Sequence, residues 1–212
     1  MKNYKCILFD CDGVLVDSEI LGTQVMVDMA NAHGANINLE FALKNFKGSF
    51  LKECISQIET ILGSPLPSTF EKEYRERSFD AFKNDLKAVK GVKEVLQALT
   101  IPFCVASSGP KEKIKLNLTL TGLAPYFEAN IFSCYDINLW KPNPAIFLHA
   151  AEQMGFKPEE CLVIEDSLAG VRAAKNGGFD VFGYAELDDK NELEKEATLV
   201  FYNMKELLPF IF

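Results

Sequence analysis

Six short runs of β-branched and aromatic residues alternate with longer amphipathic stretches along most of this 212-residue chain. The runs are predicted strands, and they are Tyr4–Phe9, Ile101–Ala106, Asn130–Ser133, Cys161–Ile164, Phe179–Phe182 and Leu199–Tyr202. The stretches between the later strands have helical periodicity, and they are Gly91–Thr100, Lys111–Thr121, Asn143–Met154 and Leu168–Lys175. This alternation is typical of a doubly wound parallel sheet, so the predicted fold class is α/β.

One segment interrupts the alternation directly after the first strand. Between about Asp17 and Ala88 the sequence has no strand pattern, only four helical patterns, at Glu19–Ala32, Leu39–Phe46, Leu51–Leu62 and Phe70–Lys83. We therefore predict an α/β core made of residues 1–16 and 89–212, with a helical subdomain of residues 17–88 inserted into it.

Composition and charge exclude several classes of partner. Hydrophobic residues make up 48% of the chain, but no apolar stretch approaches the roughly 18 residues of a membrane helix. The net charge of −8 provides no basic footprint for nucleic acid. A strand pattern begins near residue 4, and the six cysteines form no CxxC pair. We therefore expect a cytoplasmic protein without a secretory signal, with reduced thiols, that binds neither nucleic acid nor membrane.

Polar residues gather where the predicted strands end. The segments concerned are Asp10-Cys11-Asp12-Gly13, Ser107-Ser108-Gly109, Trp140-Lys141-Pro142 and Glu165-Asp166-Ser167. In an open parallel sheet, ligands bind outside the carboxyl ends of the strands. We therefore predict that carboxylates, hydroxyl groups and one lysine converge at one edge of the sheet.

Crowded carboxylates repel one another, and a hard divalent cation with oxygen ligands relieves that repulsion. Mg²⁺ suits a pair of carboxylates together with a phosphate. Taken singly, each of these acids could equally be a helix cap or a turn residue. It is their conjunction that favours a metal-assisted site for a phosphorylated ligand.

The same segments resemble, in order, the four motifs of the haloacid dehalogenase-like (HAD) superfamily of phosphohydrolases. The run from Asp10 to Glu19 is similar to the first motif, and Ser107 matches the second. Lys141-Pro142 is similar to the third motif and Glu165-Asp166-Ser167 to the fourth. The resemblance spans nearly the whole chain, and the helical insertion is similar to the helical cap of many members.

The resemblance implies a role for each acid. Asp10 would be the nucleophile that forms an aspartyl-phosphate. Asp12 would be the general acid for the leaving oxygen and then the base for the incoming water. Mg²⁺ would be the cofactor, held by Asp10, the backbone carbonyl of Asp12 and Asp166, with help from Glu165.

The remaining core motifs would contact the phosphoryl group. Ser107 would donate a hydrogen bond to it, and Lys141 would neutralise its charge, which completes the catalytic set. The other residues that we expect to bind the substrate in the core are Gly13, Ser108 and Gly109. The partner implied is a small-molecule phosphate ester, and we expect a monomer or a weak homodimer.

Four functional classes can be weighed against the sequence. Asp12 argues against metal-independent haloacid dehalogenases, which lack this acid, and against receiver domains of response regulators. The chain is most similar to bacterial sugar-phosphate phosphatases of the 6-phosphogluconate phosphatase type, in residues 46–48, 107–110 and 132–144. A hexose-phosphate mutase resembling β-phosphoglucomutase is the alternative. That family's histidine on the cap corresponds to Gly22 here, and its cap-loop arginine is missing at Phe50-Leu51-Lys52.

One residue of the helical subdomain is the leading candidate to reach the substrate. Lys47 is this candidate, and Gly48 would let its loop approach the site closely. Lys52 and Arg75 are weaker candidates. A lysine on a cap helix, Lys47 included, is more often a plain surface charge.

Overall fold

The computed structural model describes residues 3–46, 49, 51–128, 130–186, 188 and 191–210. The chain divides into two compact units. The first consists of Met1–Val16 and Lys87–Phe212, and the second of Asp17–Leu86.

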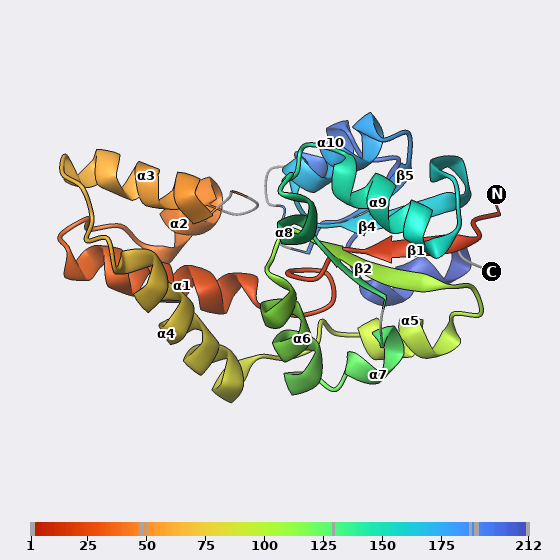
Figure 1. The fold of residues 1–212 in the computed structure, drawn as a ribbon, viewed down its shortest axis with the longest axis horizontal. Coiled ribbons are helices and arrows are strands. Elements are labelled where there is room, and N and C mark those ends of the chain that lie inside the picture. The colour runs from red at the N-terminus through yellow and green to blue at the C-terminus, as the bar shows by residue number, and fades with distance from the viewer. Residues whose placement is uncertain are drawn as a thin grey trace. The chain divides into compact units, whose positions relative to one another are not determined.

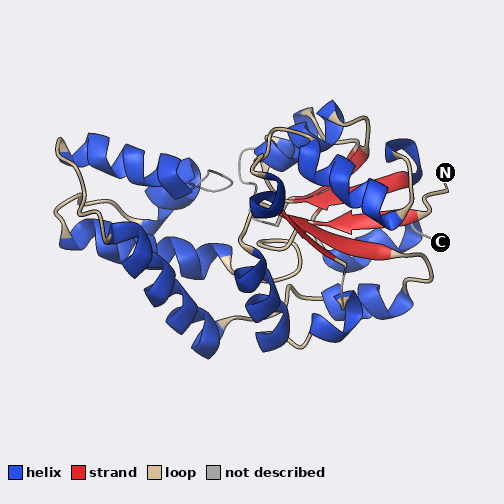
Figure 2. Ribbon diagram, in the orientation of Figure 1, coloured by secondary structure: helices blue, strands red, loops and turns tan. Residues whose placement is uncertain are grey.

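The first unit is built around one sheet of six strands (Figure 2). The strands are β1 (Cys6–Phe9), β2 (Phe103–Ser107), β3 (Ile131–Ser133), β4 (Cys161–Glu165), β5 (Asp180–Tyr184) and β6 (Leu199–Phe201). Every adjacent pair is parallel, and the spatial order is β3-β2-β1-β4-β5-β6. The predicted α/β class with a doubly wound parallel sheet is confirmed.

Helices cover both faces of this sheet (Figure 1). They are α5 (Val92–Ala98), α6 (Lys111–Leu120), α7 (Ala124–Phe127), α8 (Cys134–Ile137), α9 (Ala145–Met154) and α10 (Leu168–Asn176). Short 3₁₀ helices follow at η1 (Pro158–Glu160), η2 (Leu193–Lys195) and η3 (Met204–Phe210). Helices α9 and α10 pack on one face with small side chains of the strands, whereas Phe9, Phe103 and Phe127 form an aromatic cluster on the other.

Strand β1 occupies the position that creates a binding edge. All four of its residues are buried, and Leu8 lies in register with Cys104 of β2 on one side and Val163 of β4 on the other. The chain places β2 and β3 on one side of β1 and β4, β5 and β6 on the other, so the direction in which strands are added reverses beside β1. Loops at such a switch point splay apart and leave a crevice at the carboxyl ends of the strands.

Within its described residues, the second unit is made of four helices. They are α1 (Glu19–Ala32), α2 (Leu39–Phe46), α3 (Leu51–Leu62) and α4 (Phe70–Asp85). Helix α1 packs against α2 and α4, and Met26, Ala30, Ile58 and Phe70 belong to a hydrophobic core of the unit's own. In the part of the chain that the structure describes, no helix has both the length and the apolar character needed to cross a bilayer.

The two chain crossings between the units lie side by side within the first unit. Val16 and Ala88 form an antiparallel bridge, and the amide of Val89 donates to the carbonyl oxygen of Leu15 at 3.0 Å. These bonds hold Ala88 in the α/β unit, so the division falls between Leu86 and Lys87, two residues before the predicted boundary.

Candidate active site

The loop after β1 presents two aspartates at the carboxyl edge of the sheet. The amide of Asp10 continues the β-ladder by donating to the carbonyl oxygen of Ile164 at 2.9 Å. The chain then turns sharply at Gly13, where φ is +80° and the amide donates to Val16. A Cβ atom at Gly13 would lie 2.3 Å from Oδ2 of Asp166. Glycine is therefore needed both for the turn and for the close approach of Asp166.

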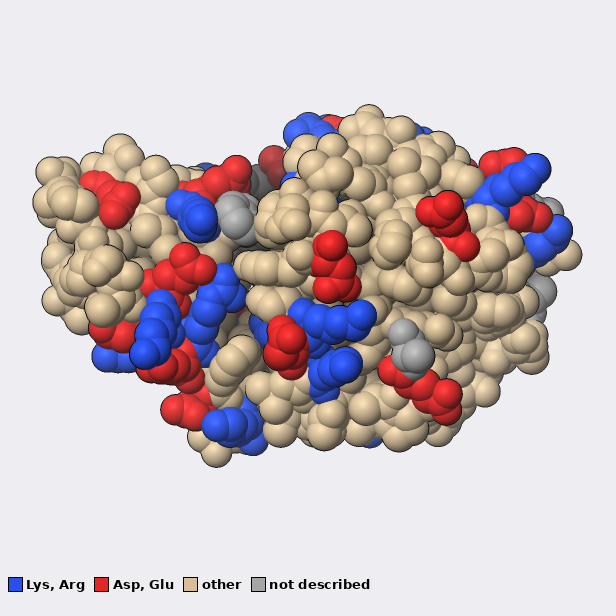
Figure 3. All heavy atoms as spheres, viewed as in Figure 1, with Lys and Arg blue, Asp and Glu red and all other residues tan. Residues whose placement is uncertain are grey.

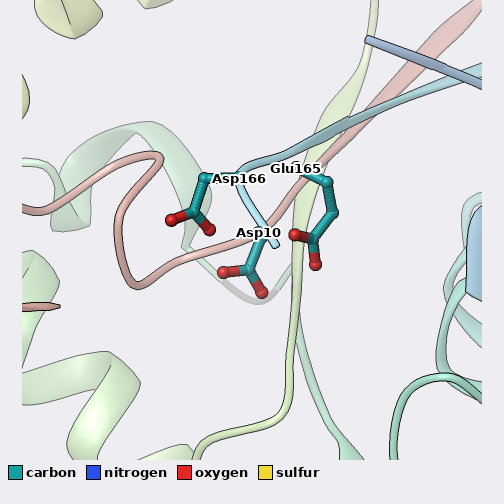
Figure 4. Close-up of side chains that lie close together, drawn as sticks. All are labelled: Asp10, Glu165 and Asp166. Carbon is teal, nitrogen blue, oxygen red and sulfur yellow. The ribbon is translucent and has the colours of Figure 1, made fainter. Parts of the chain in front are cut away.

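Three buried carboxylates meet at this edge (Figure 4). Asp10 follows β1, Glu165 ends β4 and Asp166 follows it, and one oxygen from each lies within 4.8 Å of the others. The structure thus brings Asp10 of the first motif together with both acids of the fourth. All donor atoms of this group are carboxylate oxygens, the ligand type that Mg²⁺ prefers.

Lys141 is bonded into this acidic cluster. Its Nζ atom donates to Oδ1 of Asp10 at 2.6 Å, to Oε1 of Glu165 at 2.7 Å and to the carbonyl oxygen of Ala106 at 3.2 Å. The ammonium group also lies 4.8 Å from the ring centroid of Phe147. Only 5% of the Lys141 side chain is exposed, so water does not screen these contacts.

Burial and mutual charge shift the protonation of this group. Burial raises the pKa of Asp10 well above its ordinary value, and the neighbouring Glu165 and Asp166 raise it further against the opposing charge of Lys141. Burial alone would lower the pKa of Lys141, but the charges of Asp10 and Glu165 outweigh it, and the pKa stays above its usual range. Lys141 is therefore an ammonium ion at neutral pH, and the site holds more negative charge than one lysine can balance.

Glu165 is held from two sides. Its Oε2 atom accepts hydrogen bonds from the amide and the hydroxyl group of Ser167, both at 2.9 Å, while Oε1 accepts from Lys141. A Cβ atom on Gly170 of α10 would lie only 1.8 Å from Oε1. Gly170 therefore makes room for the buried carboxylate, a role that sequence reasoning missed because a glycine inside a helix pattern gives no sign of what packs on it.

The loop after β2 brings a hydroxyl group and backbone amides to the same edge. Ser107 ends β2 and is almost fully buried, and its Oγ atom accepts a hydrogen bond from the amide of Gly109 at 3.1 Å. The carbonyl oxygen of Gly109 accepts from Ser133 at 2.7 Å, and Sγ of Cys134 lies 3.8 Å from Oγ of Ser108. This loop leads into the N-terminus of α6, where an anion is favoured.

Asp12 has partners that sequence reasoning missed. Lys113 donates to its Oδ2 atom at 2.8 Å, and Asn117 donates to its Oδ1 atom at 3.3 Å. The two partners are four residues apart on α6 and so share one face of that helix. The spacing is visible in the sequence, but it became informative only once the sheet order placed α6 beside the loop after β1.

Not every residue singled out in the sequence joins this group. Cys11 is fully buried, and burial followed by the charges of Asp12 and Asp10 raises the pKa of its thiol, which makes it unreactive. Lys47 and Gly48 lie outside the described residues. In the helical unit, Lys52 is exposed on α3, and Arg75 donates to Glu71 one turn away on α4.

Comparison with known proteins now identifies the family. A sequence model described as haloacid dehalogenase-like hydrolase matches residues 4–178. The chain belongs to the haloacid dehalogenase-like hydrolase family. It is 33% identical over 208 residues to the 6-phosphogluconate phosphatase of Escherichia coli strain K12, a match that covers 98% of this chain and 94% of that protein.

Solved structures of HAD-like proteins have the same fold. A haloacid dehalogenase-like protein of unknown function from Agrobacterium tumefaciens superposes with a TM-score of 0.89 at 33% identity, covering 99% of this chain and 98% of its own. A putative β-phosphoglucomutase from Thermotoga maritima superposes with a TM-score of 0.77 at 28% identity and 98% coverage of both chains. The predicted resemblance and the prediction of a HAD-like hydrolase are confirmed, and phosphoric monoester hydrolysis is the enzyme class that this membership supports.

The site of this HAD-like hydrolase fits a divalent cation. Asp10, Glu165 and Asp166 offer only hard oxygen donors, and burial followed by the charges of the other two carboxylates raises the pKa of Asp10. Basic side chains do not form a continuous stripe on the face shown in Figure 3, where they lie beside acidic ones. On this face the surface therefore offers no extended basic patch to a phosphate ester.

Proposed function

We propose that the chain is a Mg²⁺-dependent phosphatase that hydrolyses small sugar phosphates or phosphosugar acids through an aspartyl-phosphate intermediate. The observation that carries the proposal is the buried cluster of Asp10, Glu165 and Asp166, with Lys141 bonded into it at the carboxyl edge of the sheet. The name of the Escherichia coli relative supports the substrate class, an ester similar to 6-phosphogluconate.

The first step transfers the phosphoryl group to the protein. A carboxylate oxygen of Asp10 attacks phosphorus, and the bond between phosphorus and the ester oxygen breaks. Asp12 gives a proton to the departing oxygen, so that the sugar leaves as a neutral alcohol. Lys141 and the hydroxyl group of Ser107 stabilise the charge that spreads over the phosphoryl oxygens.

The second step releases phosphate. Water attacks the phosphorus atom of the aspartyl-phosphate, and Asp12, now a carboxylate, accepts a proton from that water. Inorganic phosphate leaves, and the Asp10 carboxylate is restored. When bound, Mg²⁺ supplies the positive charge that neutralises the clustered carboxylates and the phosphoryl oxygens. Asp10, Asp166 and the backbone carbonyl of Asp12 would hold it.

Glu165 has a supporting part in this scheme. Both of its oxygens already accept hydrogen bonds from Lys141 and Ser167, so its carboxylate is engaged in holding Lys141 beside Asp10. The substrate contacts proposed for Gly13, Ser108 and Gly109 rest on their place around the same edge. A substrate contact by Lys47 and Gly48, a cytoplasmic location and a monomeric or weakly dimeric state stay predictions.

The alternative is a hexose-phosphate mutase, which the likeness to the putative β-phosphoglucomutase from Thermotoga maritima supports. One contact in the helical unit favours the phosphatase. Gly22 stands where the mutase family has its histidine, and a Cβ atom there would lie 3.3 Å from the hydroxyl oxygen of Tyr74 and 3.7 Å from Phe82. These aromatic side chains leave little room for an imidazole at that position.

The test is phosphate release from 6-phosphogluconate, glucose 6-phosphate and p-nitrophenyl phosphate, with Mg²⁺ and with a chelator. We expect turnover that requires Mg²⁺ and disappears in Asp10→Asn, while the exposed Asp136→Asn variant keeps full activity as a control. Equal turnover in chelator, or activity in Asp10→Asn, would refute the mechanism. A coupled assay for glucose 6-phosphate formed from β-glucose 1-phosphate tests the mutase, and a positive result there would replace the phosphatase proposal.

A further inference from the structure

Helix α6 holds both oxygens of the Asp12 carboxylate. Nζ of Lys113 lies 2.8 Å from Oδ2, and Nδ2 of Asn117 lies 3.3 Å from Oδ1. The donors come from adjacent turns of one helix, and Ile114 and Leu118 of the same helix are fully buried in the core. The pair of donors is therefore fixed to the scaffold rather than carried on a loop.

Asn117 is an unfavourable residue for this position on stability grounds alone. The residue has no exposed surface, and its Oδ1 atom has no hydrogen-bond partner among the residues that the structure describes. A buried acceptor without a partner is destabilising, and an apolar side chain of the same size would avoid the penalty. The bond from Nδ2 to Asp12 is what an apolar residue could not supply.

The Asp12 contact lies beside the loop expected to bind the phosphoryl group. A Cβ atom on Gly109 would lie 3.6 Å from Oδ2 of Asp12, 3.6 Å from Oγ of Ser107 and 3.7 Å from Cδ of Lys113. The space that Gly109 leaves open is thus bordered by the proposed acid–base group, the proposed phosphoryl ligand and the lysine. Asp10 and Asp12 also have different lysine partners, Lys141 and Lys113.

We infer that Lys113 and Asn117 are positioning residues that orient Asp12 for proton transfer to and from the substrate oxygens. The inference rests on the proposed phosphatase function. The two bonds oppose rotation of the Asp12 side chain, so that its carboxyl group faces the ester oxygen when the substrate is bound. Loss of either donor removes one of these restraints while Asp12 itself stays in the chain.

The test uses the leaving group of the substrate as its readout. The p-nitrophenolate ion is a weak base that departs without a proton, whereas the alkoxide of a sugar needs one from Asp12. The ratio kcat/KM reports the steps up to and including departure of that group. We therefore expect Lys113→Met to lower kcat/KM for 6-phosphogluconate by about 10- to 100-fold and that for p-nitrophenyl phosphate by much less.

Three further variants separate positioning from a general effect on folding. Lys115→Met makes the same chemical change at an exposed position of α6 and should leave both kcat/KM values unchanged. Lys113→Arg keeps a charged donor and should recover part of the loss with 6-phosphogluconate. Asn117→Leu should lower kcat/KM for 6-phosphogluconate while its thermal unfolding midpoint stays at or above that of the wild type.

The outcomes distinguish failure of this inference from failure of the proposed function. Equal losses with both substrates in Lys113→Met, or a midpoint of Asn117→Leu well below the wild type, would overturn the positioning role while the wild type remains an active phosphatase. A wild type that releases phosphate from neither substrate would overturn the proposed function, and the positioning role with it.

Discussion

Replacing Lys141 with methionine tests whether the buried charges are arranged as described. The change removes the ammonium group that Asp10 and Glu165 share and retains a side chain of similar length. Glu165 is 1% exposed and Asp10 is 7% exposed, so water cannot take the place of the lost charge. The carbonyl oxygen of Ala106 also loses a donor. The folded state is left with uncompensated buried carboxylates.

The size of the effect follows from two estimates. Breaking a buried ion pair by removing one partner destabilises the folded state by about 3–5 kcal/mol. The folded variant can neutralise one of these carboxylates by binding a proton. At pH 7 this costs about 4 kcal/mol for a group whose ordinary pKa is near 3.9. We therefore expect a loss of about 3–4 kcal/mol, equivalent to a fall of roughly 6–16 °C in the unfolding midpoint.

The loss of stability in Lys141→Met should also grow as the pH rises. Without Lys141 the pKa of Asp10 rises further above its ordinary value, because burial and the charges of Glu165 and Asp166 then act unopposed. The folded variant binds a proton that the unfolded chain releases, so its stability falls as pH rises toward the folded pKa. The deficit relative to the wild type should be larger near about pH 8 than near about pH 5.

The assay is thermal unfolding in the presence of a chelator across this pH range. Lys5→Met is the matched control, because Lys5 forms an ion pair of the same length, 2.7 Å, with Glu160 at the surface. Water already solvates both of those charges, so the control should unfold close to the wild type. A Lys141→Met variant as stable as the wild type at pH 7, or one whose deficit does not shrink at lower pH, would refute the reasoning.

Three further changes probe the same cluster. Asp10→Asn should abolish phosphate release, yet in chelator the variant should unfold at no lower temperature than the wild type. The substitution removes one of the repelling charges and leaves Lys141 paired with Glu165. A lower unfolding temperature would contradict this account. Mg²⁺ should raise the unfolding midpoint of the wild type in a scanning fluorimetry titration, and Asp166→Asn should weaken that shift severalfold. Gly170→Ala should lower the free energy of unfolding by about 1–3 kcal/mol, measured by urea denaturation, because the new Cβ atom would meet the Glu165 carboxylate. Alanine ordinarily stabilises a helix relative to glycine, so the expected sign is the opposite of the usual one.

Local pattern predicted most of the secondary structure. Helices α1, α2 and α3 have the predicted bounds because turn residues mark their ends, and α2 and α3 also have strong periodicity. Strand β2 begins at Phe103 rather than Ile101, since Pro102 cannot donate to the ladder. The one-turn helix α8 was not predicted. Ser133 caps it by accepting from the amide of Tyr135, and so short an element gives no periodic signal.

Some residues of the site could be predicted from the sequence, and others could not. The acids after β1 and β4 could be placed together because the carboxyl ends of parallel strands share one edge, whatever the packing details. Lys113 and Gly170 could not, because their roles depend on which face of a helix meets the loop after β1 or the end of β4. A lysine or a glycine in a helix pattern is compatible with many environments until that packing is known.

Charge balance within the site explains how an acidic protein can act on an anion. Four carboxylates, those of Asp10, Asp12, Glu165 and Asp166, lie around this edge, and two ammonium groups, those of Lys113 and Lys141, are paired with them. Among these six groups, two negative charges remain when all four acids are ionised, which is the charge that one divalent cation neutralises. Burial raises the pKa of Asp10, and the charges of Glu165 and Asp166 raise it further against that of Lys141, because protonation is the other way to reduce the negative charge. In the proposed mechanism Asp10 attacks phosphorus as a carboxylate, so we expect its reactivity to depend on a bound cation.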